Sequence, residues 1–182
     1  MRKFKFDWKW TFSFFILAII YPFTASCQEI YSGPISDMTN HTKVSPAFKT
    51  IKNSFSQGNL IGVGYRHYES DYFYVGGAFY TGELSQGAIG SFSDGGIITG
   101  YQWSVGKKIN FVLENLLGGG GGYATTNAVN TNGAGLITEP MFGIDILLGK
   151  RSRAFVDVGY LYMPSSTSWS GGTVEIRIDF LD

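Results

Sequence analysis

The end of the chain alternates strictly between apolar and charged residues. In the segment TVEIRIDF, at 173–180, the apolar side chains of Val174, Ile176 and Ile178 alternate with the charged side chains of Glu175 and Arg177. A period of two places these two sets on opposite faces of a β-strand. The fold must therefore keep the two faces in different surroundings, and a sheet closed on itself does this.

Segments of this kind follow one another along most of the chain, separated by turn signals. The high glycine content of 25 residues and the aromatic content of 16% also favour strands and turns. Pro46 restricts the first segment to a strand end or an edge. We expect eight strands, at 44–55, 60–68, 72–82, 96–104, 109–120, 135–148, 154–163 and 173–181.

The predicted connections are of two kinds. Short ones at 69–71, 105–108 and 149–153 alternate with longer ones rich in Ser, Asn, Thr and Gly, at 84–95, 124–134 and 164–172. An even number of strands with alternating short and long connections is typical of outer-membrane barrels, whose longer loops face outward. The sequence therefore predicts one all-β domain at 44–182, a single antiparallel up-and-down eight-stranded transmembrane β-barrel.

The two strand faces decide what such a barrel encloses. A soluble barrel, such as a lipocalin-like carrier, needs an apolar interior, whereas a membrane barrel turns its apolar face to lipid. Tyr65, Trp103 and Tyr160 lie near strand ends on the apolar face, as in the aromatic girdles of membrane barrels. We therefore expect the charged face to line the lumen, with Arg66, Glu114, Glu139, Asp145, Asp157, Glu175 and Arg177.

Two interpretations of these lumenal charges are open. They form a structural network, in which buried charges pair with one another, or they form a binding or conduction site. Eight strands leave an interior only wide enough for interlocking side chains, which favours the network. Asn115 falls on the apolar face, which suggests a bulge near it, and the strand at 72–82 is apolar on both faces, so its orientation is undecided.

Five consecutive glycines, Gly118–Gly122, follow the apolar run FVLENLL. A phosphate-binding loop would need a Lys and a Ser or Thr opening a helix, and the following YATT offers no Lys and no helical periodicity. In a narrow barrel, glycines let a strand curve and leave room for a bulky side chain opposite. We therefore expect the run to be structural.

The N-terminus carries an export signal. Basic residues in MRKFKFDWKW precede an apolar run at 11–23 and the small residues of TASC, the order of a secretory signal peptide over residues 1–27. The apolar run is too short for a transmembrane helix. The stretch around Cys27, the single cysteine, resembles a bacterial lipoprotein box, so Cys27 is either lipidated or removed. Residues 28–43 are expected to form an exposed N-terminal segment.

The signal sequence, the loop pattern and the ending TVEIRIDFLD resemble those of the small eight-stranded outer-membrane barrels of Gram-negative bacteria. The ending is similar to the C-terminal signal that the barrel-assembly machinery recognises. The resemblance implies an outer-membrane location and contact with outer-membrane lipid and lipopolysaccharide. The scattered basic residues give no indication of nucleic-acid binding. No residues have metal-ligand spacing, and no cofactor is expected.

Some barrels of similar size are lipid-A-modifying acyltransferases or deacylases, which need a His near a Ser and an acid. His67, Ser70 and Glu69 form such a set, but at the predicted periplasmic end. We therefore expect a non-enzymatic barrel with a structural, adhesive or surface-binding role, and keep the enzyme and the soluble carrier as alternatives. The residues expected to make surface contact from the outward loops are Phe92, Asn127, Asn130 and Trp169.

Overall fold

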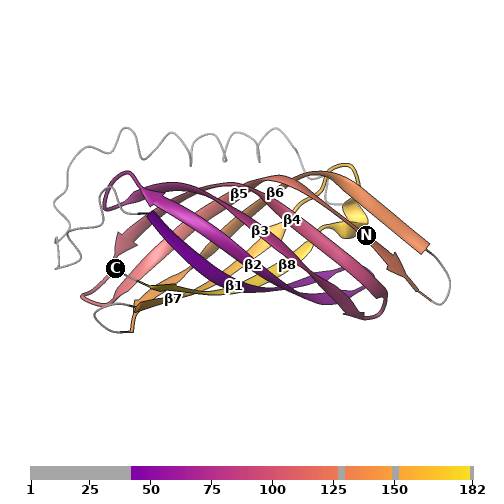
Figure 1. The fold of residues 1–182 in the computed structure, drawn as a ribbon, viewed down its shortest axis with the longest axis horizontal. Coiled ribbons are helices and arrows are strands. Elements are labelled where there is room, and N and C mark those ends of the chain that lie inside the picture. Colours follow the sequence, from indigo (N-terminus) through magenta and orange to yellow (C-terminus); the bar gives the residue numbers. More distant parts are fainter. Residues whose placement is uncertain (1–41, 127–129, 149–151, 181–182) are drawn as a thin grey trace, which may run out of the picture. The chain divides into compact units, whose positions relative to one another are not determined.

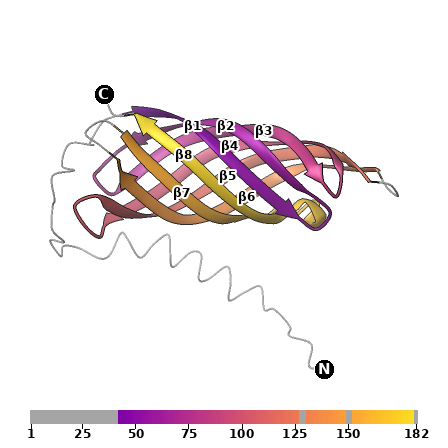
Figure 2. The ribbon, with the colours of Figure 1, turned by 90° about the horizontal axis from the view of Figure 1, so that it is seen from below.

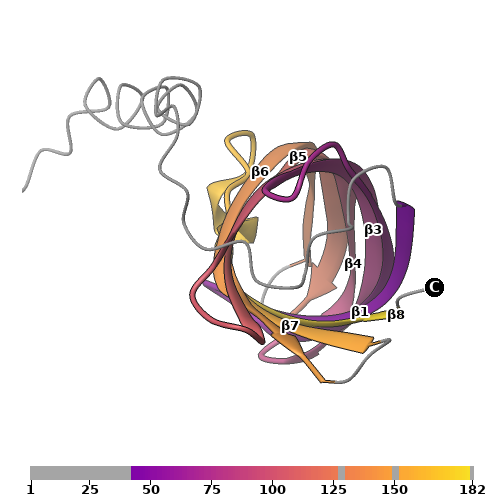
Figure 3. The ribbon, with the colours of Figure 1, turned by 90° about the vertical axis from the view of Figure 1, so that its left-hand side faces the viewer.

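The computed structural model describes residues 42–126, 130–148 and 152–180, and these form a closed barrel of antiparallel strands in the order β1 to β8 (Figure 1). Each strand pairs with the next along the chain, and β1 closes the ring by pairing with β8 (Figure 3). The predicted signal peptide at 1–27, with Cys27, and residues 28–41 of the predicted exposed segment at 28–43 lie outside the described residues. The end of that segment was wrongly predicted, because residues 42–43 already belong to the first strand and Lys43 is buried. The strands are β1 Thr42–Asn53, β2 Gln57–Tyr68, β3 Phe73–Gln86, β4 Ile89–Ser104, β5 Ile109–Thr125, β6 Asn130–Leu147, β7 Ser152–Leu161 and β8 Gly171–Phe180.

The eight strands confirm the predicted fold, but several run further than predicted. We call the end with the connections at 69–72, 105–108 and 148–151 the terminal end, because β1 begins and β8 ends there, and we call the opposite end the extended end. The predicted loop at 84–95 is wrong: β3 and β4 continue into it and leave only Gly87 and Ala88 between them, with Gly87 at a φ of 84°. Ser93 of this stretch pairs across the two strands with Thr81, and their hydroxyl oxygens lie 2.8 Å apart.

The predicted loop at 124–134 is also mostly strand, because β5 ends at Thr125 and β6 begins at Asn130. The third predicted loop, at 164–172, is irregular up to Ser170 and contains the 3-10 helix η1, Thr167–Trp169. The two ends of the barrel therefore differ mainly in how far the strands extend, and less in the length of the loops. The β5–β6 hairpin protrudes at the extended end (Figure 2). In the described part of the chain, no helix is long and apolar enough to cross a bilayer.

The strand faces point as the charge pattern predicts. Glu114, Asp157 and Arg177 are each 1% exposed and lie inside the closed ring, whereas Phe142 is 47% and Ile176 49% exposed on the outer wall. This is the reverse of a soluble barrel with an apolar centre. The outer wall carries a broad apolar surface made of these and many other large side chains, among them Val44, Ile61, Val63, Phe79, Ile97, Leu113, Leu117, Val156, Val158 and Val174.

The structure answers two questions that the strand pattern left open. Strand β3 turns Tyr74 and Tyr80 inward and Phe73 and Phe79 outward. Asn115 needs no bulge, because β5 pairs without a register shift with both β4 and β6. Its outward side chain is satisfied locally, since its amide oxygen accepts a hydrogen bond from the hydroxyl of Thr138 at 3.1 Å.

The glycine run lies within β5, where every glycine of the run except Gly119 faces crowded surroundings. A Cβ on Gly118 would overlap the carbonyl oxygen of Gly95 on the neighbouring strand. A Cβ on Gly120 would lie 3.3 Å from the Cβ of Asp94 and 3.4 Å from Cζ of Phe92. The run thus allows β4 and β5 to approach closely beside bulky inward side chains, which is the structural role expected from the sequence.

This crowding predicts that alanine will destabilise the barrel at one glycine of the run and have little effect at its neighbour. Gly118→Ala should lower the free energy of unfolding by about 1–3 kcal/mol, because the added methyl group meets backbone that cannot move aside. Gly119→Ala is the matched control, since the nearest atom to its added Cβ would be the carbonyl oxygen of Gly135, at 3.9 Å. Urea unfolding of the refolded protein would measure both, and equal effects of the two substitutions would contradict the packing argument.

Candidate functional site

Charged side chains fill the middle of the barrel. They come from every strand except β3, which contributes Tyr74 and Tyr80 instead. Their inward direction follows from the alternation along each strand, since residues two apart share a face. Among the described residues, seven carboxylates and five cationic groups are buried here: Asp94, Glu114, Glu139, Asp145, Asp157, Glu175 and Asp179 with Lys43, Lys49, Arg66, Arg153 and Arg177.

Arg66 and Glu114 form a two-pronged ion pair. Nε and Nη2 of Arg66 donate to the two carboxylate oxygens of Glu114, at 2.9 and 2.8 Å. The hydroxyl of Tyr74 donates a third hydrogen bond to Glu114, at 2.6 Å. Such bidentate, charge-assisted pairing is the strong form of a buried ion pair and fixes the positions of β2, β3 and β5 relative to one another.

Arg177 is the centre of a larger acidic cluster. Its guanidinium lies 3.0 Å from Glu175, 3.3 Å from Asp157 and 3.6 Å from Glu114, and its fourth carboxylate neighbour is Asp179 at 3.9 Å. The same guanidinium packs 4.2 Å from the centre of the Phe155 ring. One cation therefore holds together carboxylates from three strands, β5, β7 and β8.

Lys49 forms a second cluster. Its Nζ donates to Asp94 at 2.8 Å and to Glu139 at 2.9 Å, and it lies 3.8 Å from the centre of the Tyr80 ring. All three charged side chains are fully buried. The hydroxyl of Tyr80 donates in turn to Glu175 at 2.9 Å, so this cluster is joined to that of Arg177.

A third cluster lies towards the terminal end. Arg153 lies 3.0 Å from Asp145, whose other donor is the side-chain amide of Asn110 at 2.8 Å. Nearby strands contribute further polar contacts: the hydroxyl of Ser45 donates to Asp179, and Lys43 lies 4.9 Å from the centre of the Tyr68 ring.

The structure brings the predicted lumenal residues into these three clusters. Glu114, Asp157 and Glu175 surround the predicted Arg66 and Arg177, while Glu139 joins Lys49 and Asp145 joins Arg153. The prediction missed Lys43, Lys49, Asp94, Arg153 and Asp179. Asp94 and Arg153 fell in predicted loops, whereas Lys49 could have been found, because it alternates with the outward Phe48. With these residues the excess of acids inside is smaller than the sequence suggested.

An aromatic plug fills the barrel at its extended end. Trp169 of η1 stacks on Phe92, with ring centres 5.5 Å apart, and packs edge-on against Phe55 at 5.0 Å. Trp169 and Phe92 are 0% and 1% exposed. Their predicted role in surface contact is therefore wrong, because both side chains turn into the barrel, where apolar surface is removed from water. Asn130 is exposed, and Asn127 lies outside the described residues.

The candidate hydrolytic set does not assemble. Nε2 of His67 lies 3.8 Å from Glu69, with both side chains well exposed. The hydroxyl of Ser70 instead accepts hydrogen bonds from the backbone N–H groups of Tyr72, at 3.3 Å, and Phe73, at 3.0 Å. Ser70 thus stabilises the turn between β2 and β3. No cluster of three or more potential metal-binding side chains occurs at residues 42–126, 130–148 and 152–180.

A closed eight-stranded barrel with a charged, filled interior and an apolar outer wall is the arrangement of a small transmembrane barrel. Several solved structures with the same fold are outer-membrane proteins. Neisserial surface protein A matches with a TM-score of 0.61 at 7% identity, over 78% of this chain and 96% of its own. The N-terminal β-barrel domain of OprF from Pseudomonas aeruginosa matches with a TM-score of 0.59 at 12% identity, over 78% of this chain and 97% of its own.

The attachment invasion locus protein Ail of Yersinia pestis has a TM-score of 0.56 at 10% identity, over 78% of this chain and 98% of its own. These identities are low, so the likeness establishes the fold and nothing finer. No protein-family model matches the sequence, and no curated protein does so either.

Proposed function

We propose that this protein is a non-conducting outer-membrane barrel that holds a protruding β-sheet for contact with other proteins at the cell surface. The filled interior supports the first part, because its buried ion pairs and aromatic plug occupy the space a pore would need. The apolar outer wall supports membrane insertion, since such a surface would be costly in water. Lipid and lipopolysaccharide would then surround the wall, after insertion by the barrel-assembly machinery.

The observation that carries the proposal is a sheet edge. We call Ile89–Gly96, Gly118–Thr125 and Asn130–Ile137 the sheet extension; in it β5 pairs with β4 on one side and with β6 on the other. On its far side, β6 pairs with β7 only from Met141 onward, apart from a bridge between Thr138 and Tyr162. In the described residues no strand covers β6 between 130 and 137.

A sheet edge presents backbone groups that an extended segment of another protein can pair with. The N–H of Thr138 points towards β7, where it donates to Tyr162 at 3.0 Å, so the N–H groups of Asn132, Ala134 and Leu136 point to the same side. The β7–β8 connection reaches this edge through Ser165, whose hydroxyl donates to the carbonyl of Ala134 at 3.1 Å. The exposed Tyr123, opposite Asn132 on the neighbouring strand, offers an apolar anchor beside the edge.

Membrane insertion is tested by fractionation and by electrophoresis with and without heating. We expect the protein in the outer-membrane fraction, with faster migration of the unheated, folded form. Release by osmotic shock without detergent would contradict the membrane location and would favour a soluble carrier.

The contact surface is tested by a pair of substitutions at one position. Leu136→Pro removes an edge N–H group without breaking the β5–β6 pairing, whereas Leu136→Lys changes the exposed side chain and keeps the N–H. With cells that express each variant, we expect adhesion to a panel of immobilised extracellular proteins to fall about tenfold for Leu136→Pro and much less for Leu136→Lys. Equal loss in both variants would show that the side chain, and not strand addition, makes the contact.

A further inference from the structure

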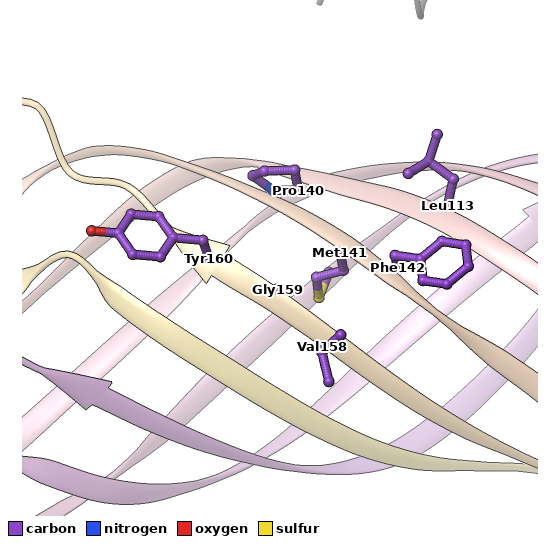
Figure 4. A pocket seen from close by; sticks show the side chains of 7 residues that line it. All are labelled: Leu113, Pro140, Met141, Phe142, Val158, Gly159 and Tyr160. Atoms are coloured by element: carbon purple, nitrogen blue, oxygen red, sulfur yellow. The ribbon is translucent and has the colours of Figure 1, made fainter. Parts of the chain in front are cut away.

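The outer wall contains a shallow groove of about 340 Å³ where β5, β6 and β7 lie side by side. Leu113 and Phe142 lie towards one end of it and Pro140 and Tyr160 towards the other (Figure 4). The inward-facing Met141 forms part of its floor, because the facing residue Gly159 has no side chain to cover it. All of its lining residues are uncharged.

A proline in the middle of the sheet accounts for the groove. Thr138 and Tyr162 exchange two backbone hydrogen bonds, at 3.0 and 2.8 Å, and pairing resumes at Met141 and Gly159. This register sets Pro140 opposite Tyr160, at the next position where both residues should donate. Proline has no N–H group, so the carbonyl oxygen of Tyr160 lacks its donor from β6. Where lipid covers the wall, an unpaired carbonyl is costly, because lipid tails offer no donor to satisfy it.

The outward side chains around the break are graded in polarity. Along the three strands, Leu113, Phe142 and Val158 form an apolar row. The next row towards the extended end contains Asn115, Pro140 and Tyr160, and Thr138 follows on β6. The groove therefore joins an apolar row to a hydrogen-bonding end on the outer wall.

We propose that this groove holds one hydroxylated acyl chain of a membrane lipid. The hydroxyl donates to the carbonyl oxygen of Tyr160, and the hydrocarbon lies along Leu113, Phe142 and Val158. The assignment rests on the membrane location proposed above, which places the apolar row of Leu113, Phe142 and Val158 against acyl chains and Tyr160 at the aromatic girdle beside it. A chain without a hydroxyl would fill the same space but would leave the carbonyl without a donor.

Native mass spectrometry of the refolded, detergent-solubilised protein can test this with equimolar 3-hydroxytetradecanoic acid and tetradecanoic acid. We expect one bound chain, with the hydroxylated acid retained about fivefold over the other, the effect of about one neutral hydrogen bond. Equal retention of the two acids by the wild-type protein would overturn the proposal.

Two variants test the unpaired carbonyl of Tyr160 and the apolar part of the groove separately. Pro140→Ala restores an N–H group to the ladder and should abolish the preference for the hydroxyl. Val158→Trp fills the groove and should lower retention of both acids at least fivefold, whereas Val63→Trp, on the opposite wall and similarly exposed, should leave it unchanged. A preference that survives in Pro140→Ala, or an equal loss in Val63→Trp, would overturn the assignment.

The heat-dependent gel shift checks that each variant is folded. A barrel that shows the shift and fractionates with the outer membrane, but retains both acids equally, overturns only this inference. A protein released by osmotic shock overturns the membrane location as well.

Discussion

Arg177→Met should lower the free energy of unfolding by about 3–5 kcal/mol, the cost of removing one partner from a buried charge cluster. The substitution keeps most of the side-chain volume but leaves the carboxylates of Glu175, Asp157 and Glu114 without their shared cation. Urea unfolding of the protein refolded into lipid vesicles, followed by the heat-dependent gel shift, would measure the change.

Two control variants make this result specific. Lys107→Met removes a charge from an exposed connection and should change stability by less than about 0.5 kcal/mol. Arg177→Lys keeps the charge but loses the planar fork, so an intermediate effect is expected. A loss below about 1 kcal/mol for Arg177→Met would mean that the acidic cluster does not depend on this cation.

Trp169→Ala should cost about 3–5 kcal/mol, the range for removing a large buried aromatic side chain. Trp169 is fully buried, and its loss would leave a cavity between Phe92 and Phe55 at the extended end. The same unfolding experiment measures it. Trp103→Ala is the matched control, because Trp103 is only half-buried and lies against Phe111 on the outer wall. Equal losses in the two variants would contradict an aromatic plug.

The charged interior also constrains strand register. A shift of one residue in β8 would turn Glu175, Arg177 and Asp179 outward and bring Val174 and Ile176 inside. An arginine on the lipid face costs about 2–4 kcal/mol at the bilayer midplane, in addition to the ion pairs lost inside. The network therefore acts against misregistered barrels, and its charges need not take part in transport to be useful to the protein.

The two proposed contacts, the acyl-chain groove and the β6 edge for other proteins, lie in different parts of the protein. The groove at Pro140 belongs to the membrane-facing wall, whereas the edge of β6 from Asn130 to Ile137 lies beyond the part of this strand that pairs with β7. Substitutions in one should therefore leave the other intact, since well-separated sites behave independently.

Strand number and strand faces could be predicted from the sequence because they depend on local alternation. The segment at 173–180 shows its inward and outward faces without reference to any other strand. Strand ends could not be predicted in the same way. The stretch at 84–95 is rich in Gly and Ser and has the composition of a loop, yet it forms strand because β5 lies beside it and pairs with β4 up to Thr125.

The candidate site, too, could be predicted only in part from the sequence. That Glu114, Asp157 and Arg177 face inward followed from their positions in alternating segments. That Lys49 meets Glu139, 90 residues away, depends on how eight strands are staggered around the ring, and no local pattern contains that stagger. Trp169 was placed at the surface for a similar reason, because a polar, irregular connection gives no indication that it folds back into the barrel.

The amino-acid pattern specifies strands with charged groups on one face and apolar groups on the other, because side-chain direction in a strand depends only on position along that strand. Which cation meets which acid, where each strand stops, and that Pro140 interrupts the wall opposite Tyr160 follow only from how the strands pair in the folded barrel. Those features arise from the register between segments far apart in the chain, because a backbone group of one strand is satisfied only if the neighbouring strand offers a hydrogen-bond partner opposite it.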